Sequence, residues 1–382
     1  MTSKHAAFGV SANRTKAVLV SGNQTGETIM KHSCAQKETQ TMKKTQTNHP
    51  QRSTGLLALA IALTVTLSMI VSAHEIDQTS RIIWPDVIPI PVGFEPEGIE
   101  LGKDQEFFVG TLAWSGDHTN AGAIYKGNLM TGEGQVLVKP TGKKISGLSY
   151  DARTDYLYAA TGHSGGFAGP RWEQGVKVYA GTSGRLLGEI IFGDDMVIND
   201  VLVTDTAVYC TDSASTTLYK LPLEDDGKVF ASAPEKIEMT GFEMVEGLNA
   251  NGLVGDFDGR ELVIINITSG VLYLVDTETG AASPVDVHGE EQLFADGDGL
   301  YMDGRTLYIM QNFSQKIAVV ELSDDLTQGT FVKNIVSDDF SIPTTITGYG
   351  NCIYAINTHF LEFIAEGADP AVVQSEVVKV FK

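Results

Sequence analysis

A phrase that recurs about every fifty residues constrains the fold of this chain more than any other feature. Each copy begins with a polar residue, usually followed by glycine, and continues with a short apolar run, a turn and a second strand-like run. Successive copies lie 46 to 53 residues apart. Their starting pairs are Glu97-Gly98, Ser146-Gly147, Asn199-Asp200, Asn251-Gly252, Asp298-Gly299 and Thr344-Thr345. A repeat of this length is one structural unit that buries its apolar faces against its neighbours.

Each repeat holds about four short strand-like runs, and no long apolar segment with a helical period follows residue 73. Six such units predict an all-β, six-bladed β-propeller with four-stranded blades over residues 94–382. Closing the ring buries both faces of every blade and removes exposed edges. We expect a strand within residues 74–93 to pair into the last blade. The alternatives are a ring of five or seven blades, or an open β-sandwich.

The segment before the repeats has the features of an export signal. Residues 1–54 are polar and lack hydrophobic periodicity, so we expect them to be disordered. Residues 55–73 are apolar and end in small residues, which predicts a signal peptide that is cleaved after Ala73. Met42 and two lysines precede it, so Met42 is the expected start, or 1–41 is an unusual extension. The protein is then secreted or periplasmic, or membrane-anchored if the segment stays uncleaved.

The chain is strongly acidic, with a formal net charge of −21. Only two of its 48 Asp and Glu residues precede residue 74, so the repeats carry nearly all of the negative charge. Such a surface repels nucleic acid and anionic membranes and attracts cations. The chain also lacks a phosphate-binding glycine loop, a zinc-ligand spacing and a G-x-S-x-G nucleophile motif.

The first residue of each starting pair predicts a metal site. In a propeller the innermost strands line the central channel, so these six residues stand at one height around the axis. All six carry oxygen, and Glu97, Asn199, Asn251 and Asp298 supply two carboxylates and two amides. This set suits Ca²⁺, whereas Zn²⁺ prefers nitrogen or sulfur and Mg²⁺ stays an alternative. Singly these residues are typical of turns; four at one register favour a metal site.

These motifs resemble the regucalcin–gluconolactonase family and its relatives, the paraoxonases and diisopropyl-fluorophosphatase-like phosphotriesterases. The likeness covers about residues 94–382 and rests on "PEGI" (96–99), "NDV" (199–201), "NGL" (251–253) and "DGL" (298–300). The resemblance implies a divalent ion at the channel mouth, held by Glu97, Asn199, Asn251 and Asp298. It implies metal-dependent hydrolysis of lactones, esters or phosphotriesters, with Asp298 as the base or nucleophile.

Two departures from the family pattern bear on the substrate. Sugar-lactonase members usually have an arginine where this chain has Val197, which puts aldonolactone specificity in doubt. Paraoxonase-type members have a histidine where this chain has Ser146, which puts a histidine-dyad mechanism in doubt. The strictosidine synthase group shares the propeller but lacks the four ligands.

The sequence therefore predicts a Ca²⁺-dependent hydrolase of small lactones or esters. Besides Asn199, the expected substrate-binding residues are Ser146 and Thr344 of the ring and Trp114, His163 and Trp172 of the two longest loops. The alternative is a non-enzymatic propeller that calcium stabilises and that binds a protein or a small ligand.

Overall fold

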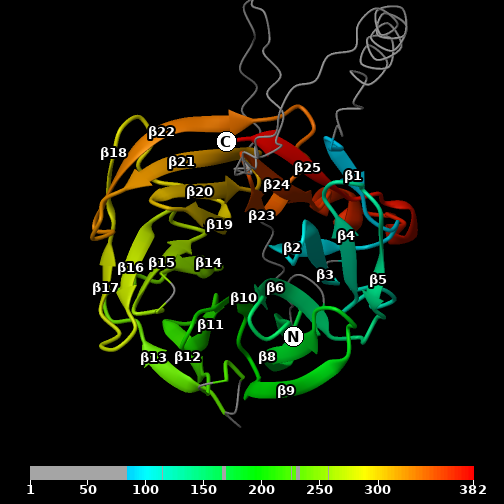
Figure 1. Ribbon diagram of the computed structural model, residues 1–382, viewed down its shortest axis with the longest axis horizontal. Helices are drawn as coiled ribbons and strands as arrows, with labels where there is room; N and C mark the ends of the chain where they lie inside the picture. The colour runs from blue at the N-terminus through cyan, green and yellow to red at the C-terminus, as the bar shows by residue number, and fades with distance from the viewer. Residues whose placement is uncertain (1–83, 114, 166–168, 225, 229–232, 257) are drawn as a thin grey trace, which may run out of the picture. The chain divides into compact units, whose positions relative to one another are not determined.

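The computed structural model describes residues 84–113, 115–165, 169–224, 226–228, 233–256 and 258–382. The predicted six-bladed, all-β propeller is confirmed: six sheets follow one another around a ring, five of four strands and one of five (Figure 1). The expected disordered segment, the signal peptide and Met42 lie outside the described residues. No helix within the described ranges is long and apolar enough to cross a membrane.

The blades, numbered 1 to 6 in chain order, share one strand order. The innermost strands are β2 (Pro96–Leu101), β6 (Lys144–Asp151), β10 (Ile198–Val203), β14 (Ala250–Gly255), β19 (Gly297–Asp303) and β23 (Pro343–Tyr349). The second strands are β3 (Glu106–Thr111), β7 (Tyr156–Ser164), β11 (Ala207–Asp212), β15 (Glu261–Asn266), β20 (Thr306–Gln311) and β24 (Cys352–Asn357).

The outer half of each blade follows the same order. The third strands are β4 (Ile124–Asn128), β8 (Arg171–Ala180), β12 (Thr217–Pro222), β16 (Leu272–Asp276), β21 (Lys316–Leu322) and β25 (Glu376–Phe381). The fourth strands are β5 (Gly134–Val138), β9 (Leu186–Gly193), β13 (Glu235–Glu238), β17 (Ala282–Pro284), β22 (Gln328–Val336) and β1 (Val87–Pro89). A fifth strand of blade 5, β18 (Asp286–His288), pairs in parallel with β22.

Helix is scarce, as the strand-like repeat predicts. Within the described residues it comprises the five-residue helix α2 (Phe360–Ile364) and the 3₁₀ turn η1 (Pro370–Val372), both between β24 and β25.

The apolar core lies between the blades. Six clusters of buried side chains pack in the described part of the chain, and each joins two neighbouring blades. Ile88 of β1 is 1% exposed and belongs to the cluster between blades 6 and 1. β1 pairs antiparallel with β25, so the last blade combines strands from both ends of the propeller.

A β-bulge interrupts the innermost hairpin of every blade at the same place. In blade 1, Pro96 pairs with Thr111 and Ile99 with Val109, so two residues of β2 oppose one residue of β3. The same two-against-one register occurs in the other five blades. In each blade the two bulged residues are the starting pair of the repeat. Because a bulge redirects a side chain, it explains how a polar residue faces the channel beside a buried strand.

Glycine at the second bulged position allows neighbouring inner strands to approach closely. A side chain at Gly98 of β2 would meet the Ser146 carbonyl of β6 at 2.4 Å, and one at Gly252 of β14 would meet the Asp298 carbonyl of β19 at 2.3 Å. The glycine, which is present in four of the six bulges, thus allows neighbouring inner strands to pack closely around the axis; Asp200 and Thr345 stand at this position in blades 3 and 6.

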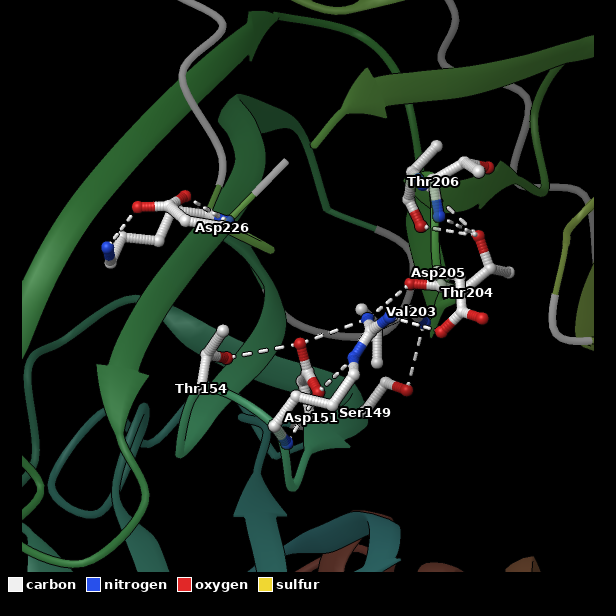
Figure 2. Close-up of polar contacts among 11 residues, drawn as sticks. Ser149, Asp151, Thr154, Val203, Thr204, Asp205, Thr206 and Asp226 are labelled. Atoms are coloured by element: carbon white, nitrogen blue, oxygen red, sulfur yellow. Dashed lines mark hydrogen bonds and ion pairs between the residues drawn. The ribbon is translucent and has the colours of Figure 1, made fainter. Parts of the chain in front are cut away.

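Polar contacts also join the blades away from the axis. Arg153, in the turn after β6, binds Asp151 of its own blade (Nε–Oδ1, 2.8 Å) and donates to the Thr204 carbonyl of blade 3 at 2.7 Å. It also pairs with Asp205, and the Val203 N–H donates to the Ser149 hydroxyl at 3.1 Å. Figure 2 shows these contacts between the turns of blades 2 and 3.

Candidate functional site

The first bulged residues of all six blades line one cavity at the channel. Its volume is about 130 Å³. The six residues are Glu97, Ser146, Asn199, Asn251, Asp298 and Thr344, and each is at most 8% exposed. Residues that lie up to 247 positions apart in the sequence therefore meet at one place, which we call the polar floor.

The two carboxylates of the polar floor are buried without a full set of partners. Glu97 is 5% exposed, and its Oε2 has no hydrogen-bond partner among the described residues. Burial raises the pKa of Glu97 well above its usual value; the charges of Asp298 and Asp200 add to this effect, and Lys144 opposes it. An unpartnered carboxylate oxygen in a cavity is a group that a cation would satisfy.

Asp298 is better supported by its neighbours. Asn312 donates its side-chain N–H to Asp298 Oδ2 at 3.0 Å, and Asn251 also donates to the carboxylate. Burial raises the pKa of Asp298 to about 7; these hydrogen bonds act in the opposite direction, and the charge of Asp200 raises the pKa further. Asn312 follows β20, the strand that pairs with β19, and Asn251 belongs to β14 of blade 4. The carboxylate of Asp298 is therefore held from its own blade and from the neighbouring blade.

The amides and hydroxyls of the polar floor use their donor groups within the protein. Asn199 donates its side-chain N–H to the Ser213 hydroxyl at 2.9 Å, which leaves its carbonyl oxygen for a ligand. Thr344 donates to the Glu97 backbone carbonyl at 2.7 Å and joins blade 6 to blade 1. Ser146 donates to the Ile198 carbonyl at 3.3 Å and joins blade 2 to blade 3. The floor therefore offers mostly acceptor oxygens.

Lys144, which the sequence analysis did not single out, also lines the cavity. Its side chain is buried, and Nζ donates to the Ile198 carbonyl at 2.7 Å and to the Ser146 hydroxyl at 3.1 Å. Burial lowers the pKa of Lys144 to about 8, and Glu97 opposes this shift. A sequence signal existed: Lys144 lies two residues before Ser146, in a strand whose alternate side chains share a face.

Two of the expected loop residues, His163 and Trp172, do not line the cavity. His163 of β7 and Trp172 of β8 stack on each other, with ring centroids 4.9 Å apart. Their chain neighbours Ser164 and Arg171 do line it. Trp114 lies outside the described residues.

Apolar side chains form the upper wall of the cavity. They lie just before the innermost strand or just after the second strand of blades 1, 3, 4, 5 and 6, and include Leu112, Val197, Leu248, Ile267, Phe313 and Phe360. Phe313 follows β20, and its ring meets that of Phe360 edge to face with centroids 6.1 Å apart. Sequence reasoning missed these two aromatic residues because Phe313 follows a strand and Phe360 begins a five-residue helix, and neither belongs to the repeated pattern.

The donor set of the polar floor fits a hard divalent cation. Within the described ranges, no group of three or more His, Cys, Asp or Glu residues can hold a metal, so an ion here depends on the amide oxygens of Asn199 and Asn251. Carboxylate and amide oxygens are the ligands that Ca²⁺ takes, and Glu97 has a buried oxygen without a partner. Lys144 adds one positive charge beside the polar floor, and this charge weakens the attraction of the floor for a metal ion.

Comparison with known proteins defines the class of fold. Mala s 1, a major allergen of Malassezia sympodialis, superposes with a TM-score of 0.55 at 16% sequence identity, over 77% of this chain and 96% of that chain. At this identity the likeness shows the propeller fold alone.

Two other solved structures align less well. A protein described as a putative glucose dehydrogenase, from Thermus thermophilus, aligns with a TM-score of 0.49 at 13% identity, over 77% of this chain and 99% of its own. A putative 6-phosphogluconolactonase from Bacteroides fragilis aligns with a TM-score of 0.46 at 14% identity, over 68% of this chain and 76% of its own. No protein-family profile matches the chain, and no curated protein matches it.

Proposed function

We propose that this protein is an exported, Ca²⁺-dependent hydrolase of small lactones or esters. The observation that carries the proposal is the polar floor, where six bulges bring two carboxylates and two amides to one cavity. The resemblance of these four residues to the ligand set of the regucalcin–gluconolactonase family supports the same assignment. The apolar segment 55–73 supports export.

Glu97, Asn199, Asn251 and Asp298 would hold the ion. When bound there, Ca²⁺ supplies Lewis-acid polarisation of a substrate carbonyl. The two asparagines offer carbonyl oxygens, and Glu97 offers the oxygen that has no other partner.

Asp298 is the proposed base or nucleophile. Its carboxylate is held by Asn312, which donates to Oδ2 at 3.0 Å, and by Asn251; in the proposal this carboxylate accepts the proton of an attacking water or attacks the carbonyl itself. Ser146 and Thr344 orient the substrate from opposite sides of Glu97. The apolar upper wall limits the water that reaches the carbonyl.

Hydrolysis assays on the exported part, residues 74–382, test this proposal. Lactones, aryl esters and phosphotriesters are assayed with Ca²⁺ and after chelation. We expect hydrolysis of a lactone or ester that chelation removes and added Ca²⁺ restores. Asp298→Asn should lower turnover by about a hundredfold or more, whereas Asp303→Asn, at an exposed position of the same strand, should not. Calcium-independent hydrolysis, or full activity in Asp298→Asn, would contradict the proposal.

One observation favours a second function, a non-enzymatic ligand-binding propeller. The Lys144 ammonium lines the same cavity as Glu97 and Asp298, so part of their negative charge is balanced by the protein itself. This alternative predicts ligand binding without hydrolysis of any substrate in the panel, with or without Ca²⁺.

A further inference from the structure

The cavity has two chemically different sides. Blade 2 contributes Lys144, Ser146, Ser164 and Arg171, all of which are polar or charged. In a ring of six, blade 5 lies across the axis from blade 2, and contacts between successive inner strands give this order. Blade 5 contributes Asp298 and Asn312 to the cavity and also Phe313. The wall beside the polar floor is therefore polar on the blade 2 side, at Ser164 and Arg171, and aromatic on the blade 5 side, at Phe313.

The aromatic side is open to solvent and continues on the surface. Phe313 is 52% exposed although it lines the cavity, and its partner Phe360 is 7% exposed. Leu361 and Ile364 of α2, beside Phe360, are 56% and 42% exposed. When an apolar group of a ligand covers a half-exposed aromatic ring, apolar surface of both is removed from water, which favours binding.

The polar floor presents mainly acceptor oxygens. Asn199, Thr344 and Asn312 each use a donor within the protein, on the Ser213 hydroxyl, the Glu97 carbonyl and Asp298. On the sides of blades 3 and 4, the side chains of the upper wall are apolar, at Val197, Leu248 and Ile267. The hydroxyl groups of a sugar lactone that face these apolar side chains would lose water without gaining new partners.

We infer that the ligand of this cavity is a small amphipathic molecule, whose polar carbonyl end lies over the polar floor near blade 2. Its aliphatic or aromatic end lies against Phe313 and Phe360. That the ligand is a lactone or ester rests on the proposed function, whereas its amphipathic character rests on the cavity walls. Val197 and the two phenylalanines then set specificity for an apolar substituent.

Calorimetric titration with lactams tests this inference without requiring turnover, because lactams imitate lactones and resist hydrolysis. The probes are 2-pyrrolidinone, its 5-propyl and 5-hexyl derivatives, and gluconolactam, each titrated into residues 74–382 with Ca²⁺ present. We expect affinity to rise about threefold for each added methylene that reaches the wall. Gluconolactam should bind more weakly than the 5-hexyl compound.

Substitution of Phe313 locates the apolar end of the ligand. Phe313→Ser should lower the affinity for the 5-hexyl compound about tenfold and the affinity for 2-pyrrolidinone less than twofold. The matched control is Phe381→Ser, because Phe381 of β25 is 45% exposed and does not line the cavity. The inference is overturned if affinity does not depend on chain length, if gluconolactam binds best, or if both variants behave alike.

The two proposals fail in different ways. Chain-length-dependent lactam binding without hydrolysis of any ester or lactone would remove the proposed function and leave this inference standing. Calcium-dependent hydrolysis of sugar lactones without any preference for apolar substituents would keep the function and overturn the inference.

Discussion

At the scale of single residues, the chemistry of the cavity depends on a balance of buried charges. Glu97 and Asp298 are buried acids, and Lys144 is a buried base whose Nζ contacts the same ring through Ser146. The pKa of each carboxyl group is raised, and the pKa of Lys144 is lowered, chiefly because burial disfavours the charged form. A bound cation would favour the ionised carboxylates, and the ammonium would oppose that cation.

The first prediction at this scale is that Lys144→Gln tightens Ca²⁺ binding. Removing a repulsion of about 1 kcal/mol should lower the dissociation constant about fivefold. Calorimetric titration of chelator-treated protein measures this change. The matched control is Lys177→Gln, because Lys177 is also buried in blade 2 but binds Thr141 and does not line the cavity. Unchanged or weaker Ca²⁺ binding in Lys144→Gln would show that the ammonium does not act on the ion.

Only part of the cavity could be predicted at the residue level. The six ring residues followed from the repeat, because equivalent positions of a propeller must meet at the axis. Lys144 stands outside the repeated pair; its position two residues before Ser146 indicates the same strand face, but the other repeats have no basic residue there to mark it as part of the ring. His163 and Trp172 were expected from loop composition, and they stack on each other instead of lining the cavity.

At the scale of secondary structure elements, the short helix α2 forms a part of the cavity wall that lies outside the repeated strands. It supplies Phe360, and the residue before it, His359, has a positive φ of 51°. His359 Nδ1 lies 2.8 Å from Glu362 of α2, and Nε2 lies 3.0 Å from Glu376 of β25. The Ser341 hydroxyl also contacts Nδ1, at 3.1 Å. The imidazole therefore joins the short helix to the sheet of blade 6.

The prediction at this scale concerns pH. The hydrogen bond to Glu376 is the largest effect on the pKa of His359 and raises it; Glu362 adds to the rise, and burial opposes it. Because the pKa in the folded protein is raised, the stabilisation is complete below the unfolded value of about 6.5 and is lost as pH rises through the folded value. His359→Asn should therefore lower the melting temperature at pH 5.5 and lower it less at pH 9.

The substitution by asparagine isolates the charge, because asparagine tolerates a positive φ. Thermal unfolding between pH 5 and 9 measures the difference from the unmodified protein. The control is His288→Asn, since the His288 side chain is 61% exposed. A melting-temperature difference that stays constant over this range would mean that His359 acts through packing and not through its charge.

The bulges are the elements that sequence reasoning could not supply. The repeated polar-glycine pair indicated a special backbone position, but a turn explains such a pair equally well. The two-against-one register becomes visible only when the partner strand is known, as for Pro96 and Ile99 opposite Thr111 and Val109. Once the bulge is known, both residues of the pair are explained: the polar side chain faces the channel, and glycine permits contact with the next blade.

At the scale of the whole molecule, the period of the repeat was sufficient to predict the fold. Six units of similar length specify six blades, because each blade needs two neighbours to bury its faces. The structure bears this out, with one apolar cluster between each pair of adjacent blades in the described residues. The apolar wall of the cavity had no such signature, because its residues come from unrelated loops whose meeting point depends on the closed ring.

The central claim is that four side chains from blades 1, 3, 4 and 5 bind one hard divalent cation. The most direct test is calorimetric titration of Ca²⁺ into chelator-treated residues 74–382, together with the melting temperature at each Ca²⁺ concentration. We predict one ion per chain and a melting temperature that rises with Ca²⁺, because the ion binds only the folded ring. Glu97→Gln should remove both effects, whereas Glu100→Gln, which changes a half-buried carboxyl group of β2 outside the cavity, should keep them. Absence of a binding isotherm, or identical Ca²⁺ binding in the unmodified protein and Glu97→Gln, would contradict the claim.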